Sequence, residues 1–193
     1  EKIECIKTTP SFGVINPNKF NTDSPQILDQ VTKIKVCSAT DYNPTSIKRI
    51  TFMNGLDEFK GKTGSGWGTC PESQDKAFEV QSGDQVNKVQ IFFDIIGGYY
   101  GIVGIKFYTN LLKESELFGR VGNYQIIVNF SGKLRSFFLY AGYLYDGLGF
   151  YLDDQNFSLP DCLQNCTKYC NNYENECLKS DNYEVLKENV QDS

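Results

Sequence analysis

One stretch of the sequence gathers residue types that suit ligand binding. Gly142 to Tyr151 is rich in aromatic residues and glycine, holds a single carboxylate, Asp146, and predicts a turn followed by a strand. A carboxylate accepts strong hydrogen bonds, glycine lets the backbone approach a ligand closely, and an aromatic ring offers a flat apolar face. We interpret this stretch as a binding loop and the rest of the chain as the scaffold that positions it.

The residue types argue against catalysis. The chain has no histidine, which excludes Ser-His-Asp and Cys-His catalysis, His-ligated zinc and the usual general base near neutral pH. The adjacent acids Asp153 and Asp154 point to opposite faces of a strand, and we interpret them as a solvated strand end. Because no nucleophile and base can be paired, we expect neither an enzyme nor a cofactor.

The charge of the chain narrows the class of partner. The net charge is −5, and no basic stripe is present to displace counterions from phosphates, so nucleic acid is excluded as a partner. No apolar run is long enough to predict a transmembrane helix.

The cysteine content indicates an oxidising compartment, because cytosolic proteins keep their thiols reduced. The seven cysteines are Cys5, Cys37, Cys70, Cys162, Cys166, Cys170 and Cys177. Asn-x-Ser/Thr triplets agree with secretion, and their glycosylation candidates are Asn129, Asn156 and Asn165. We expect a glycoprotein that is secreted, extracellular or on the cell surface. Since seven is odd, one cysteine stays free or bonds another chain.

The hydrophobic pattern predicts an all-β body over residues 31–152, preceded by an irregular segment, 1–30, that packs on it. About ten strand candidates lie between Lys33 and Leu152 at hairpin spacing. The clearest pair alternates apolar and polar residues on each side of the Gly97–Gly101 loop, which predicts an antiparallel hairpin. The only tryptophan, Trp67, lies among the glycines of 61–68, and we interpret that segment as a turn with an anchoring ring.

Residues 153–193 predict a Cys-rich helical tail. A helix starts near Ser158 and ends near Lys179, and Tyr183 to Val190 predicts a short second helix. Three tail cysteines recur every four residues on one helical face, which does not by itself supply the four converging ligands of a zinc site, so no metal is expected. We expect disulfides from this face to Cys5, Cys37 and Cys70, or to the second helical segment.

The second half of the body resembles the jacalin-like lectins in order and spacing. The resemblance rests on Val103–Asn110, on Phe118-Gly119, and on Gly142–Asp146 running into Leu148–Tyr151, and it covers roughly residues 32–152. It implies a β-prism of three antiparallel four-stranded Greek-key sheets, with a shallow sugar site made by loops at one end. The tail lies outside the family.

The resemblance also implies roles for individual residues. Asp146 would accept hydrogen bonds from two adjacent sugar hydroxyls, Tyr143 and Leu144 would offer backbone N–H groups, and Gly142 would allow the turn. Gly98 and Tyr99 correspond to a second loop, with Tyr99 as the stacking ring. The alternatives are that Asp146 caps a turn and that the tyrosines pack at a sheet end.

One departure from the family leaves two functions open. Where the family has a Gly-Gly pair near its N-terminus, the segment Ser11–Asn16 has one glycine, Gly13. The first hypothesis is a secreted, non-enzymatic lectin-like protein whose partners are glycans or glycoproteins. The second is a structural subunit of an extracellular or cell-surface assembly, without sugar binding, that uses the prism and tail for protein contacts and oligomerises through them.

Overall fold

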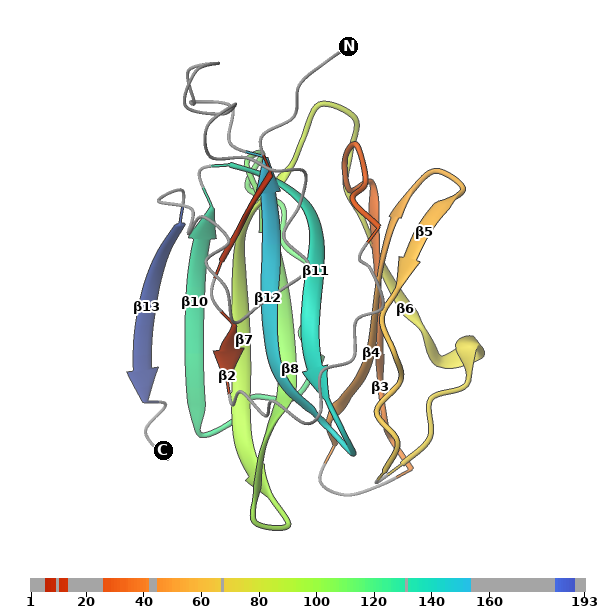
Figure 1. The fold of residues 1–193 in the computed structure, drawn as a ribbon, viewed down its shortest axis with the longest axis vertical. Helices are drawn as coiled ribbons and strands as arrows, with labels where there is room; N and C mark the ends of the chain where they lie inside the picture. The colour runs from red at the N-terminus through yellow and green to blue at the C-terminus, as the bar shows by residue number, and fades with distance from the viewer. Residues whose placement is uncertain are drawn as a thin grey trace.

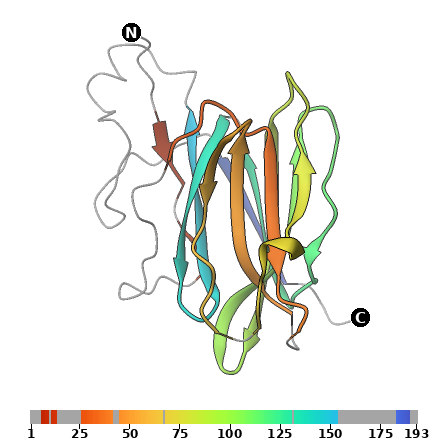
Figure 2. The same ribbon diagram turned by 90° about the vertical axis from the view of Figure 1, so that its right-hand side faces the viewer.

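The computed structural model describes residues 6–9, 11–13, 26–41, 45–66, 68–130, 132–153 and 183–189. These residues form thirteen strands in three antiparallel sheets and one short 3₁₀ turn, η1 (Glu72–Gln74). Figures 1 and 2 show the sheets packed around a common centre. Ten of the strands, β3 to β12, lie between Lys33 and Asp153, which confirms the all-β prediction. Within the described ranges, no helix could cross a membrane.

The first sheet holds the predicted binding loop. Its strands are β1 (Ile6–Thr8), β2 (Phe12–Gly13), β11 (Lys133–Ala141) and β12 (Tyr145–Asp153). Strand β12 lies between β11 on one side and both β1 and β2 on the other. Its last residue, Asp153, is not a solvated strand end as expected, because it is buried and pairs with Arg135 at 2.9 Å. A buried carboxylate needs such a partner.

The second sheet contains the predicted hairpin. Its strands are β7 (Val86–Ile96), β8 (Tyr99–Thr109), β9 (Phe118–Gly119), β10 (Tyr124–Phe130) and β13 (Tyr183–Asn189). Strands β7 to β10 form the predicted four-stranded sheet, and β13 adds a fifth strand at its edge, beside β10. The expected second helix over Tyr183–Val190 is therefore wrong. Strand β10 offers an open edge, and all seven residues of β13 pair with it. The rest of the predicted helical tail lies outside the described residues.

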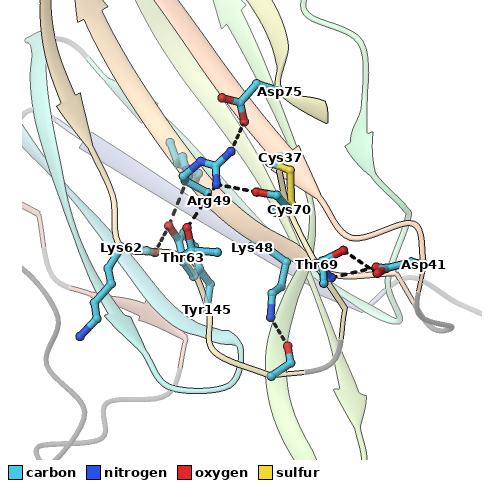
Figure 3. Close-up of a disulfide and its surroundings, with 12 residues drawn as sticks. Cys37, Asp41, Lys48, Arg49, Lys62, Thr63, Thr69, Cys70, Asp75 and Tyr145 are labelled. Atoms are coloured by element: carbon cyan, nitrogen blue, oxygen red, sulfur yellow. Dashed lines mark hydrogen bonds and ion pairs between the residues drawn. A yellow bond between two sulfur atoms is a disulfide. The ribbon is translucent and has the colours of Figure 1, made fainter. Parts of the chain in front are cut away.

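The third sheet carries the disulfide. Its strands are β3 (Lys33–Ser38), β4 (Ile47–Asn54), β5 (Asp57–Lys60) and β6 (Lys76–Glu79). Cys37 on β3 is bonded to Cys70 in the loop between β5 and β6, as Figure 3 shows. Disulfides were expected, but the predicted bridges from the tail to Cys37 and Cys70 are wrong, because these two pair with each other. The other cysteines lie outside the described residues.

The three sheets share one core. The Phe52 ring on β4 lies 4.7 Å from the Phe137 ring on β11 and 6.4 Å from the Phe107 ring on β8, centroid to centroid. All three side chains are fully buried. One aromatic cluster thus contacts all three sheets.

Tyr145 joins the core to the loop that follows β5. Its side chain is fully buried, and its hydroxyl donates to the Lys62 carbonyl at 2.6 Å and accepts from the Ile50 N–H at 3.2 Å. Burial raises the pKa of the Tyr145 phenol. The residue is structural.

We predict that breaking the Cys37–Cys70 bridge destabilises the prism. The bridge spans 33 residues of sequence. Releasing a loop of that length increases the entropy of the unfolded chain, which should cost about 3–4 kcal/mol of folding free energy. Urea unfolding of the double variant Cys37→Ala, Cys70→Ala measures this loss of folding free energy. An unchanged free energy of unfolding would contradict the prediction.

Tyr145→Phe should lower the free energy of unfolding by about 1–3 kcal/mol, because it leaves the buried Ile50 N–H and the partly buried Lys62 carbonyl without their partner. Ultraviolet titration of the folded protein gives a second measurement. Since the raised pKa keeps Tyr145 protonated while exposed tyrosines ionise near pH 10, the variant should ionise as many tyrosines there as the parent. A smaller amplitude would show that Tyr145 titrates normally.

Candidate carbohydrate-binding site

The turn between β11 and β12 positions the predicted acceptor, Asp146. Gly142 donates its N–H to the Leu144 carbonyl at 2.9 Å, which closes the turn. Tyr140 then pairs with Gly147 while Ala141 pairs with Tyr145, so Asp146 is the extra residue of a β-bulge. A bulge reverses which face the following residues occupy. Tyr145 and Leu148 can therefore both be buried while Asp146 stays partly exposed.

The β7–β8 hairpin positions the second predicted loop. Gly97 and Gly98 form its two-residue turn, with φ of +56° and +83°. Positive φ at both turn positions is typical of the tight turns that suit twisted strands, which explains the glycine pair. The next side chain, Tyr99, is 56% exposed.

Leu144 packs the two loops together. Its side chain is buried with Phe92, Ile96 and Val103 of the hairpin. A Cβ on Gly101 would lie 2.8 Å from the Leu144 side chain, so the strand backbone approaches it directly. Leu144 therefore holds the Gly142–Asp146 loop at the same end of the prism as the hairpin (Figure 1), and only its backbone is suited to contact a ligand.

Gly13 lies beside Asp146, as the resemblance implied. Strand β2 pairs with β12 at Gly147, and Gly13 has φ of +112°. A Cβ there would lie 2.3 Å from the Asp146 carbonyl oxygen, so this position needs glycine. The preceding Phe12 side chain is buried in the core against Phe150, and so it does not obstruct the site.

The tyrosines near the site divide into two groups. Tyr143 and Tyr99 are more than half exposed. Tyr100 instead packs against the Tyr124 and Phe93 rings, 5.4 and 6.4 Å away between centroids, and Tyr145 is fully buried. The edge-packing alternative thus holds for Tyr100 and Tyr145, whereas Tyr99 and Tyr143 present their rings at the surface.

Sequence reasoning missed two contributors to the site, Lys48 and the segment Gly64–Gly66. This segment pairs with Gly142 and Tyr143, and the Lys48 ammonium donates to carbonyls of both stretches. Burial lowers the pKa of that ammonium. The run of glycines at 61–68 is the available signal, but its interpretation as a turn anchored by Trp67 does not connect it to the site. Trp67 lies outside the described residues.

The remaining predicted residues divide by location. Asn129 lies on β10, between β7 and β13, whereas Asn156 and Asn165 lie outside the described residues. The described residues hold no group of three or more His, Cys, Asp or Glu side chains that could bind a metal. The site therefore offers one carboxylate, exposed aromatic rings and backbone groups, a set suited to hydrogen bonding with a polyhydroxylated ligand.

Solved structures with a similar fold include several lectins. A mannose-binding jacalin-related lectin from Ananas comosus is 18% identical, with a TM-score of 0.58 over 76% of this chain and 96% of its own. Calsepa lectin in complex with bisected glycan is 18% identical, with a TM-score of 0.58 over 79% of this chain and 99% of its own. Artocarpin complexed with Me-alpha-mannose is 15% identical, with a TM-score of 0.58 over 76% and 97%.

No family model matches the sequence, and no curated protein matches it. The likeness to the solved structures, at 14–18% identity, shows the fold. It agrees with the three-sheet topology and with the order of motifs that carried the resemblance. The chain has the β-prism fold that is seen in the jacalin-related lectins.

Proposed function

We propose that this chain is a non-enzymatic carbohydrate-binding protein that holds a hexose at the Asp146 end of its prism. The observation that carries the proposal is the meeting of Gly13, the Gly142–Asp146 turn and the β7–β8 hairpin at one end. Asp146, on its bulge, is the acceptor for two sugar hydroxyls. The N–H groups of Tyr143 and Leu144 are the donors, and Tyr99 packs against the sugar's C–H surface.

The ligand class is supported by the neighbours of this fold. The Ananas comosus lectin binds mannose, and artocarpin was solved with Me-alpha-mannose. We propose mannose-type hexoses as the first ligands to test. Secretion, as the cysteines and the Asn-x-Ser/Thr triplets indicate, would place the protein among glycans and glycoproteins. The alternative, an assembly subunit without sugar binding, is the outcome that an absence of binding would favour.

Asp146→Ala and the isosteric Asp146→Asn should each weaken glycan binding about 10- to 100-fold, because charge-assisted hydrogen bonds to hydroxyls are lost. A glycan array followed by calorimetry with methyl α-mannoside measures the effect. Asp57→Ala is the matched control, since this exposed carboxylate starts β5 in the hairpin at the opposite end of the prism. No saturable binding by the parent, or equal binding by all variants, would overturn the proposed site.

Gly13→Ala should weaken both sugar binding and folding, because its Cβ would meet the Asp146 carbonyl and push β2 away from β12. Gly83→Ala is the control that separates the effect of the Cβ contact from the effect of backbone strain. Gly83 also has a positive φ, +80°, but a Cβ there meets nothing within 4 Å. Calorimetry should show normal affinity for Gly83→Ala. Equal loss of affinity in both variants would show that strain alone is responsible.

A further inference from the structure

The segment Gly64–Gly66 runs alongside the binding turn although about 77 residues of sequence separate them. Ser65 donates its N–H to the Gly142 carbonyl at 3.0 Å, and its hydroxyl donates to the same oxygen at 3.2 Å. Gly66 donates its N–H to the Tyr143 carbonyl at 3.3 Å. Both carbonyls of the turn are therefore held by this one segment.

Two glycines make this approach possible. A Cβ on Gly64 would lie 2.8 Å from the Tyr143 carbonyl oxygen, and a Cβ on Gly66 would lie 2.6 Å from the Tyr143 ring. Side chains at either position would separate the two stretches. The glycine run thus allows the backbone to reach Tyr143.

Lys48 joins the two stretches from beneath. It lies on β4 with its side chain fully buried, and its Nζ donates to the Tyr143 carbonyl at 3.2 Å and to the Gly66 carbonyl. Figure 3 shows Lys48 with one of its contacts to a backbone carbonyl. Its own carbonyl accepts from the Gly64 N–H at 2.9 Å. Among charged groups, Asp41 acts on it electrostatically and itself accepts from Thr69, farther along the same loop.

The direction of these two carbonyls fixes the direction of the two backbone N–H groups proposed to donate to the sugar. In a trans peptide the C=O of one residue and the N–H of the next point in opposite directions. Because Ser65 holds the Gly142 carbonyl, the Tyr143 N–H is turned away from the segment. Because Lys48 and Gly66 hold the Tyr143 carbonyl, the Leu144 N–H is turned away as well.

We propose that Lys48 is a positioning residue for carbohydrate binding: with Gly64–Gly66 it orients the two peptide groups whose N–H donors face the sugar. This inference rests on the proposed function. Lys48 itself is buried beneath the turn and acts through these peptide groups. The glycines at 64 and 66 thus serve the site by letting this segment approach the binding turn.

Lys48→Met tests the inference, because methionine is similar in length and removes the charge and the donors. Calorimetry with methyl α-mannoside should show affinity reduced by about tenfold or more. Arg135→Met is the matched control: Arg135 is an equally buried cation on β11, at the opposite end of the prism, and its loss should leave affinity within about threefold. Unchanged affinity in Lys48→Met, or an equal loss in Arg135→Met, would overturn the proposal.

Amide hydrogen exchange gives a readout that does not require sugar. Lys48→Met should speed exchange at Ser65 and Gly66, whose N–H groups donate to the Gly142 and Tyr143 carbonyls, and leave the strands around Phe52 protected. Should the parent not bind sugar, the proposed function fails, and unchanged exchange at these two amides would then overturn the role of Lys48 separately. Should Lys48→Met not fold, Gly66→Ala replaces it, because its Cβ would meet the Tyr143 ring without removing a buried donor; normal affinity and exchange in that variant would overturn the proposal.

Discussion

The burial of three sheet faces in one core is the constraint on which the rest of the structure depends. Phe52, Phe107 and Phe137 each come from a different sheet and meet in one cluster, so none of the sheets can be displaced without opening the others. Backbone polar groups of the inner strands are paired on both sides in the ladders. Away from the sheet edges, hydrogen-bonding groups for a ligand come from the turns at the ends of the prism, where the chain leaves the ladders.

The turns at one end are irregular, and the structure stabilises them individually. A bulge keeps Asp146 partly exposed, Gly13 permits close strand approach, and Leu144 anchors the turn in a small apolar cluster. Lys48 is the least expected element, since burying an ammonium opposes folding unless its donors are satisfied. The Gly66 and Tyr143 carbonyls accept hydrogen bonds from this ammonium, at the point where two loops distant in sequence meet.

The sequence predicted the parts whose signals are local. Alternation along β7 and β8 and the Gly97-Gly98 turn identified the hairpin, and the motif order identified the Asp146 loop. The missed parts depend on contacts distant in sequence: Lys48 and Tyr143 lie 95 residues apart. Likewise β13 is a strand because β10 has an open edge, and no local pattern in the tail encodes that edge.

The topology also bears on the two functions that the sequence left open, because it places the binding turn and the strand ends next to the tail at different ends of the prism. Strand β12 starts at the Asp146 end and finishes at Asp153, at the opposite end. Strand β13 begins at Tyr183, paired with Phe130, which is the end of β10 away from the hairpin tip. The last residue of β12 and the first residue of β13 thus both lie at the end of the prism opposite Asp146 (Figure 1). A partner that contacts the prism at these two strand ends would leave the binding turn accessible, so the proposed sugar site and the proposed assembly role do not exclude each other.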